Sequence, residues 1–279
     1  MSIRDITIII SSFRSGDKIR TCLKSINNQC KVINIENSND QDYKKKIENE
    51  FKNVECILTG KNLGYATANN LGLKKTKTKF ALILNPDTKI SENTLEQFIE
   101  TVKKYPDFAI MGVEEANKEN SNSEISRDIV FSTNSVKGHA MLLNLSEFKK
   151  TGFFDEKFFI YLEEIDLCNR LIRNGKKIFV NSEININHQG GSSHEPSINF
   201  EMELSRNWHW MWSRFYYQKK TKGYFASLIK FIPIFLIVFI KTVFYTLILN
   251  KKKSSIYFCR LSGVISSMIG LRSWYRPKV

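Results

Sequence analysis

The chain has 279 residues, of which 42% are hydrophobic, so its composition is that of a globular protein rather than a disordered one. Its formal net charge is +14, and the excess lies in the last quarter, because Arg206 to Val279 hold fourteen Lys and Arg and no Asp or Glu. The preceding 205 residues carry 28 basic and 28 acidic side chains and so have no net charge.

The first hundred residues alternate between apolar runs and amphipathic segments. We expect strands at Ile6–Ile10, Lys31–Ile35, Val54–Leu58 and Phe80–Leu84, and helices at Asp17–Asn28, Asp42–Lys52, Tyr65–Leu73 and Ser91–Lys104, the last capped by its serine. Strand alternating with helix predicts an α/β protein with a doubly wound, mostly parallel sheet.

The next hundred residues are less regular. Residues 114–126 are polar and predict a mobile loop. We expect a strand at Lys137–Leu143, a helix around Ser146–Thr151, a helix at Glu163–Asn174 closed by Gly175, and short strands at Lys177–Val180 and Ile184–Asn187.

The five cysteines are odd in number and form no Cys-x-x-Cys pair, which indicates reduced structural thiols of a cytoplasmic protein. The first apolar run is too short for a signal peptide.

Four stretches carry groups that could do chemistry. Asp87 follows a buried strand, where a carboxylate can bind a divalent cation, although Asn85–Thr88 is also an ordinary turn sequence. Asn62–Asn70 can approach a ligand through Gly64, or be a plain loop before a helix. His188 precedes a flexible Gly pair and is either a metal ligand or a packing residue.

The fourth stretch, Tyr161–Arg170, puts three carboxylates within four residues at a helix start. Glu163 and Asp166 share a face, and Glu164 points elsewhere. Such acids either compensate the helix dipole or act as a base whose pKa is raised by the neighbouring aromatic residues.

In their order and spacing, these motifs resemble family 2 glycosyltransferases, especially the rhamnosyltransferase-like branch that builds bacterial surface polysaccharides. The resemblance covers about residues 4–200 and rests on six segments: Ile6–Phe13, Val32–Asn37, Asn62–Asn70, Leu82–Thr88, Gly152–Arg170 and His188–Ser193.

The resemblance implies a GT-A fold and a metal-dependent enzyme that inverts the sugar's anomeric carbon. By resemblance, Asp87 and His188 hold Mg²⁺ or Mn²⁺ against the donor's diphosphate, and Glu164 is the base, with Asp166 as a rival. It also assigns two groups of binding residues: Ser12, Phe13, Glu36, Asn62, Gly64, Asn69, Asn85 and Asp87 for the donor, and Tyr161 and Glu163 for the acceptor.

Three positions depart from the family pattern. Glu164 and Glu36 stand where the family usually has Asp, and Asn85 replaces the first acid of its metal-binding motif. The two glutamates give weight to an alternative, a non-catalytic sugar-nucleotide-binding or scaffold protein with the same fold.

The basic tail contains an aromatic cluster, the apolar run Phe231–Leu249 and a second amphipathic stretch, Ile256–Leu271. Lys241 and Pro233 favour peripheral or monotopic attachment to an anionic membrane over a spanning helix. Packing on the catalytic domain or in a homodimer is compatible with this, whereas binding of nucleic acid would leave the apolar run unexplained.

The sequence therefore predicts a GT-A catalytic domain at residues 1–205, with a nucleotide-binding half (about 1–112) and an acceptor half (about 113–205). Residues 206–279 form a basic helical membrane-associating appendage. The expected reaction transfers rhamnose or a hexose from a dTDP- or UDP-sugar to a lipid-linked saccharide, as in O-antigen or capsule synthesis, on the cytoplasmic face of a bacterial inner membrane.

Overall fold

A computed structural model describes residues 1–114, 128–188, 190 and 193–277 of the protein. The polar stretch expected to be a loop lies mostly outside these described residues. The chain divides into two compact units. The first comprises Met1–Leu63, Thr67–Phe154 and Glu164–Glu195, and the second comprises Gly64–Ala66, Asp155–Glu163 and Pro196–Val279.

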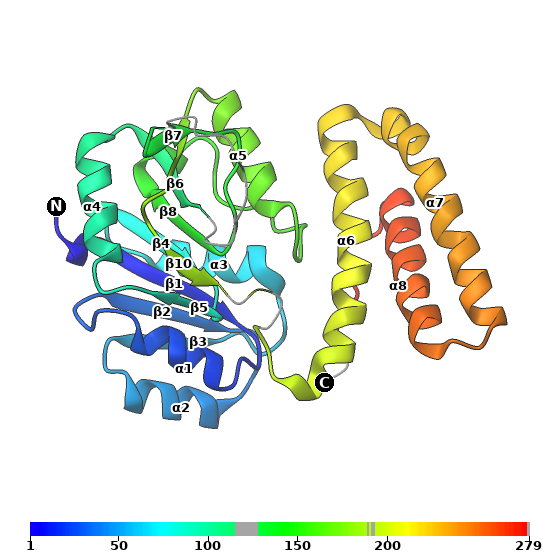
Figure 1. Ribbon diagram of the computed structural model, residues 1–279, viewed down its shortest axis with the longest axis horizontal. Helices are drawn as coiled ribbons and strands as arrows, with labels where there is room; N and C mark the ends of the chain where they lie inside the picture. The colour runs from blue at the N-terminus through cyan, green and yellow to red at the C-terminus, as the bar shows by residue number, and fades with distance from the viewer. Residues whose placement is uncertain (115–127, 189, 191–192, 278–279) are drawn as a thin grey trace. The chain divides into compact units, whose positions relative to one another are not determined.

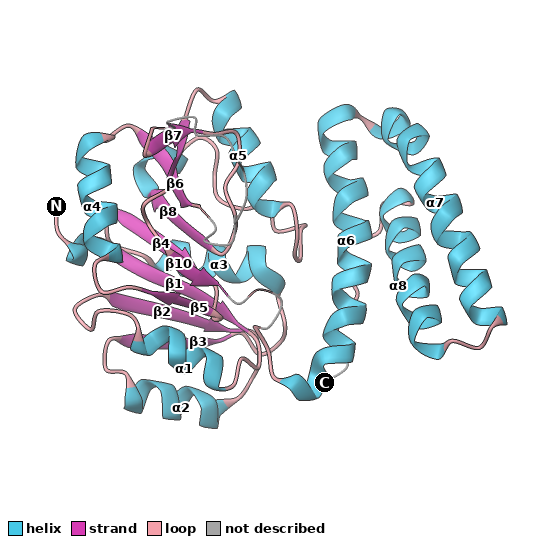
Figure 2. Ribbon diagram, viewed as in Figure 1, coloured by secondary structure: helices cyan, strands magenta, loops and turns pink. Residues whose placement is uncertain are grey.

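The first unit is built on an eight-stranded mixed sheet (Figures 1 and 2), with the order β3-β2-β1-β4-β8-β6-β9-β7. Its strands are β1 (Ile6–Ser12), β2 (Lys31–Glu36), β3 (Val54–Leu58), β4 (Phe80–Leu84), β6 (Phe108–Val113), β7 (Val130–Ser132), β8 (Ala140–Asn144) and β9 (Lys177–Asn181). Strands β3, β2, β1 and β4 run parallel, as does the pair β6–β9, and β8 and β7 pair antiparallel to their neighbours. The expected mostly parallel α/β sheet is confirmed.

Five helices belong wholly or largely to this unit: α1 (Asp17–Lys24), α2 (Gln41–Glu50), α3 (Gly64–Lys75), α4 (Thr94–Lys104) and α5 (Glu163–Arg173). All five residues of β4 are buried, as expected for a strand covered on both faces. A second, two-stranded sheet pairs β5 (Thr88–Ile90) with β10 (Ile186–His188) antiparallel.

Several local expectations need correction. The helix expected around Ser146–Thr151 is only a 3₁₀ turn, Leu145–Phe148, which a bond from Gly152 N–H to the Phe148 carbonyl closes. Helix α4 begins at Thr94 rather than Ser91, because Ser91 forms a turn whose carbonyl and hydroxyl both bond to Thr94. The expected strand at 137–143 begins only at Ala140, and the one at 184–187 is Ile186–His188.

The second unit contains α6 (Asn199–Lys222), α7 (Tyr224–Leu247) and α8 (Lys251–Met268). Helices α6 and α8 cross closely at Gly263, where a Cβ would overlap the Trp208 carbonyl oxygen. Trp208, Trp212 and Phe215 of α6 are buried in this unit. The expected helical appendage is confirmed; the boundary at residue 205 stays a prediction, and α6 begins before it.

Candidate active site

Three neighbouring parallel strands, β2, β1 and β4, end on one edge of the sheet, and polar side chains cluster there. At the end of β1, the buried Ser12 hydroxyl lies 2.5 Å from Glu36 Oε2 and 2.9 Å from Asn34 Oδ1 of β2. The Arg14 amide donates to the other carboxyl oxygen, Oε1 of Glu36, at 3.2 Å. This edge is where open α/β sheets bind ligands.

Burial raises the pKa of Glu36, although the hydrogen bonds from Ser12, Arg14 and Ser38 oppose the rise. Glu36 is 1% exposed, so in the structure it organises the ends of β1 and β2. Phe13 follows Ser12 and is partly exposed.

The loop before α3 is tied to the same edge by Asn37, which the sequence analysis did not single out. Asn37 is buried, its Nδ2 donates to Ser11 Oγ, and its Oδ1 accepts from the Leu63 amide at 3.1 Å. Asn62 lies beside Leu63 and is half-buried, and Asn69 is fully buried on α3.

Asp87 and His188, 101 positions apart, are brought together by the β5–β10 pairing, in which His188 lies opposite Thr88. His188 Nε2 lies 3.4 Å from Asp87 Oδ1 and 3.4 Å from Asn85 Nδ2. The Thr88 hydroxyl donates to the Asn85 carbonyl at 2.7 Å. The stretch Asn85–Thr88 is thus a turn, as one of the two interpretations held, and it presents a carboxylate.

The Asp87 side chain is buried, and neither carboxyl oxygen has a hydrogen bond of ordinary length. Burial alone would raise the pKa of Asp87, but the hydrogen bond and positive charge of His188, with the Ser193 hydroxyl, hold it below its usual value. His188 also stacks on His139, with ring centroids 4.5 Å apart.

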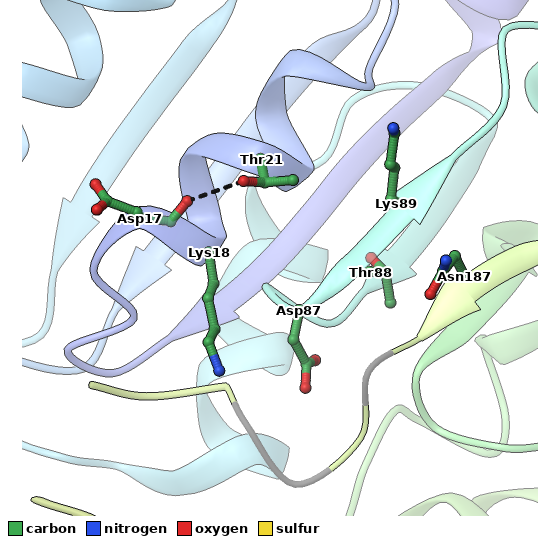
Figure 3. A pocket seen from close by; sticks show the side chains of 7 residues that line it. All are labelled: Asp17, Lys18, Thr21, Asp87, Thr88, Lys89 and Asn187. Atoms are coloured by element: carbon green, nitrogen blue, oxygen red, sulfur yellow. Dashed lines mark hydrogen bonds between the residues drawn. The ribbon is translucent and has the colours of Figure 1, made fainter. Parts of the chain in front are cut away.

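A pocket of about 200 Å³ opens beside Asp87 (Figure 3), lined by Asp17, Lys18, Thr21, Asp87, Thr88, Lys89 and Asn187. Figure 3 shows the Lys18 amine and the Asp87 carboxylate pointing toward the same side. These lysines were missed by the sequence analysis, although Lys18 lies in the first turn of the helix after β1 and Lys89 directly follows the acidic turn.

These residues fit a divalent ion whose coordination shell is completed by oxygen atoms of a substrate. Within the described residues, no group of three or more His, Cys, Asp and Glu side chains could hold a metal alone. Mg²⁺ typically takes only one or two protein carboxylates and fills its shell with water and phosphate oxygens. A buried carboxylate that has no hydrogen bond of ordinary length and faces a pocket suits that role.

Glu164 lies in a different pocket of the first unit, of about 260 Å³, with Ser135, Val136, Lys137 and Ile165 among its lining residues. Burial raises the pKa of Glu164, and the positive charge of Lys137 opposes the rise. A carboxyl with a raised pKa in a cleft has the properties of a general base.

Asp166 is engaged elsewhere. It is 3% exposed and accepts from Arg170 Nε at 2.8 Å, while the other guanidinium nitrogens donate to the carbonyls of Thr151 and Phe153. Arg170 thereby ties α5 to the preceding segment, and Asp166 completes that clamp.

The two expected acceptor residues belong to the second unit. Tyr161 and Leu162 both have left-handed backbones, with φ of 75° and 68°, which is strained for side chains of this size. Tyr161 packs edge-on against Trp210 of α6 at 5.4 Å, and Glu163 is buried at the start of α5.

Gly64 also belongs to the second unit. With φ of 80°, its backbone lies so close to Phe159 that a Cβ would overlap the Phe159 carbonyl oxygen and ring. The sequence predicted that the backbone at Gly64 could approach a ligand; in the structure it approaches Phe159.

Comparisons with known proteins agree with this architecture. The model of the family described as glycosyl transferase family 2 matches residues 7–168. The low-salt glycan biosynthesis hexosyltransferase Agl10 of Haloferax volcanii is 23% identical over 193 residues, or 61% of this chain and 62% of that protein. Rhamnosyltransferase WbbL of Escherichia coli is 26% identical over 212 residues, covering 61% and 78%.

Among solved structures, mannosyltransferase PcManGT from Pyrobaculum calidifontis, in complex with GDP-Man and Mn²⁺, is 8% identical with a TM-score of 0.59, covering 95% of this chain and 87% of that one. TarS of S. aureus is 15% identical with a TM-score of 0.54, covering 72% of this chain and only 38% of that one. The match thus spans under two thirds of Agl10 and of this TarS chain, and the structural likeness concerns the fold.

Proposed function

Because the chain belongs to glycosyl transferase family 2, we propose that it is an inverting, metal-dependent glycosyltransferase. It moves rhamnose or a hexose from a dTDP- or UDP-sugar to a lipid-linked saccharide during synthesis of a surface polysaccharide. The relatives named as a hexosyltransferase and a rhamnosyltransferase support this choice of sugar.

The observation that carries the proposal is the pairing of Asp87 with His188 beside a pocket that contains Lys18 and Lys89. Asp87 and His188 would hold Mg²⁺ or Mn²⁺, which supplies charge neutralisation for a departing diphosphate. Lys18, whose amine points to the same side as the Asp87 carboxylate (Figure 3), adds positive charge for the same phosphates. PcManGT, with the same fold, was solved with a nucleotide-sugar and Mn²⁺.

On the donor side, the Ser12–Glu36 pair at the ends of β1 and β2 would bind the nucleoside, together with Phe13, Asn62 and Asn69. The raised pKa of Glu36 reflects burial, so the carboxyl group is held by hydrogen bonds within the protein rather than solvated by water.

Glu164 is our choice of base, because it lines a pocket while Asp166 is bound to Arg170. Its carboxylate would accept the proton of the acceptor hydroxyl as that oxygen attacks the sugar. Burial favours proton acceptance, since it disfavours the charged form.

Membrane attachment is proposed for the second unit. Helix α7 is long and apolar enough to cross a bilayer by length and composition, and only 17% of its most apolar window is buried. The triplet Lys251–Lys253 begins the next helix, and the tail has no acidic residue. These features suit peripheral or monotopic attachment to an anionic surface, here the cytoplasmic face of a membrane.

The test is a panel of nucleotide-sugars with Mn²⁺, read first as thermal shift and then as transfer. A donor stabilises the fold by mass action. Asp87→Asn should lose both the metal-dependent shift and turnover, whereas Glu164→Gln should keep the shift and lose turnover. A non-catalytic binder would show the shift without turnover in the parent protein, and parent-like transfer by both variants would refute the site assignment.

A further inference from the structure

One face of α6 carries Arg206, Trp210 and Arg214, which are spaced four residues apart and therefore share one side of the helix. The two arginines are separated by a helical rise of about 12 Å. Trp210 lies between them, is 40% exposed and meets the Tyr161 ring edge-on.

At one end of this face, Tyr161 lies within electrostatic range of both Arg206 and Glu163. Burial raises the pKa of Tyr161; the positive charge of Arg206 opposes that rise, and the negative charge of Glu163 adds to it. These three groups lie together where the acceptor residues are proposed.

At the other end, the Arg214 guanidinium lies 5.5 Å from the centroid of the Trp210 ring and 5.7 Å from that of Phe231 on α7. No carboxylate of the described residues forms an ion pair with it. Gln218, the next residue on the same face, accepts from Lys230 Nζ at 3.3 Å, so a second cation stands close by.

Helix α7, which carries Lys230, also has an exposed apolar side. One side of α7 packs in the unit through Phe231 and Val238, and large apolar side chains on the other side are exposed: Phe225 (79%), Ile229 (72%), Ile232 (52%), Leu236 (50%) and Ile240 (63%). An exposed aromatic ring, cations and an apolar surface are thus all present on α6 and α7 of this unit.

We infer that this face binds the saccharide–phosphate–lipid junction of the acceptor, an inference that rests on the proposed function. A sugar ring packs its C–H face on Trp210, the linking phosphate or diphosphate binds Arg214 and Lys230, and the hydrocarbon chain lies along α7. A planar guanidinium matches phosphate oxygens with two parallel hydrogen bonds, and no carboxylate in the described part of the chain competes for Arg214.

The experiment titrates farnesyl diphosphate and farnesol into the full-length protein in detergent. The parent protein should prefer the diphosphate. Arg214→Ala should weaken diphosphate binding about tenfold or more and leave farnesol binding unchanged, since a charge-assisted hydrogen bond is lost. Arg214→Lys, which keeps the charge but not the fork, should fall between. Arg272→Ala, which removes an exposed arginine outside α6 and α7, is the matched control and should bind both probes like the parent.

Two results would overturn the inference: equal affinity of the parent protein for both probes, or parent-like diphosphate binding by Arg214→Ala. Sedimentation with phosphatidylglycerol vesicles separates an acceptor phosphate from bulk lipid headgroups. Arg214→Ala should sediment like the parent; its release from vesicles with diphosphate affinity intact would also refute an acceptor site.

A separate readout isolates the proposed function. The nucleotide-sugar thermal shift should be the same in Arg214→Ala and in the parent, because the donor groups lie in the first unit. If the parent shows no such shift with any donor, the proposed function fails while the farnesyl preference is still judged independently.

Discussion

Two glutamates replace the aspartates usual in the family, and burial raises the pKa of both Glu36 and Glu164. Their partners differ: Glu36 accepts hydrogen bonds from Ser12 and Arg14, while Glu164 faces a pocket with Lys137. The two acids can be identified from the sequence. The proximity of Lys137 to Glu164 cannot, because the two residues are 27 positions apart and belong to no common motif.

The raised pKa of Glu36 predicts a pH-dependent stability. An unfolded Glu has a pKa of about 4.3, and the folded carboxyl keeps its proton to higher pH. The native state therefore binds more protons, so this group's contribution to stability falls as pH rises from the unfolded pKa through the folded one. Urea unfolding at pH 5 and pH 8 should show a smaller loss of stability in Glu36→Gln than in the parent. An equal loss in both proteins would contradict this.

Lys137 predicts the direction of a pH–rate shift. Its charge opposes the burial-driven rise in the pKa of Glu164, so Lys137→Met should raise that pKa further. A base works only when deprotonated, and the acid limb of the kcat profile should therefore move to higher pH. Lys149→Met, at an exposed site, is the control. An unmoved or acid-shifted limb would rule out Glu164 as the titrating base.

Gly64 makes a packing prediction. Gly64→Ala adds a Cβ that overlaps the Phe159 backbone, and it must also hold a left-handed φ of 80°. Gly60→Ala imposes a similar φ of 74° but meets open space. We expect Gly60→Ala to cost about 1–2 kcal/mol, and Gly64→Ala about 1–3 kcal/mol more from overpacking. Chemical denaturation of the two variants, compared directly, measures the difference.

A helix or strand can be predicted from the sequence when the residues that make it form lie within the element itself. Strand β4 is visible because five apolar residues in a row need both faces covered. Strand β6 has the same signal over Phe108–Val113 and was overlooked, whereas β5 and β10 are three residues each and exist only because they pair. The β5–β10 pairing places His188 beside Asp87. The family resemblance implied that the two residues share a site, but it did not give the distance between them.

Helix α5 gives the element-scale prediction. Arg170→Ala removes the ion pair that Arg170 forms with the buried Asp166, and it frees two backbone carbonyls. Breaking such a pair costs about 3–5 kcal/mol, which urea denaturation at neutral pH would register. Arg173→Ala, an exposed arginine one turn further, should stay within about 0.5 kcal/mol of the parent. Similar midpoints for the two variants would mean that the clamp does not stabilise α5.

For the whole molecule, the charge division between residues 1–205 and 206–279 anticipated a chemically different second part. The charge division does not predict how the helices of the second part pack. Trp208 and Trp212 bury themselves between α6 and α8, with bonds from Trp208 Nε1 to Ser262 and from Ser267 to the Trp212 carbonyl. Cutting the chain after α6 would therefore uncover a core, so truncation is a poor test of membrane attachment.

Surface substitution on α7 is the sharper test. Ile229, Leu236 and Ile240 are 72%, 50% and 63% exposed, so changing all three to Gln removes apolar surface without opening the helix packing. Each such side chain gains roughly 1.5–3 kcal/mol when it leaves water fully. Even partial insertion then predicts at least about a hundredfold weaker partition into vesicles. Sedimentation with phosphatidylglycerol vesicles measures the partition, and an unchanged melting temperature in detergent-free buffer verifies the fold. A triple variant that still sediments like the parent would mean that α7 does not contact lipid.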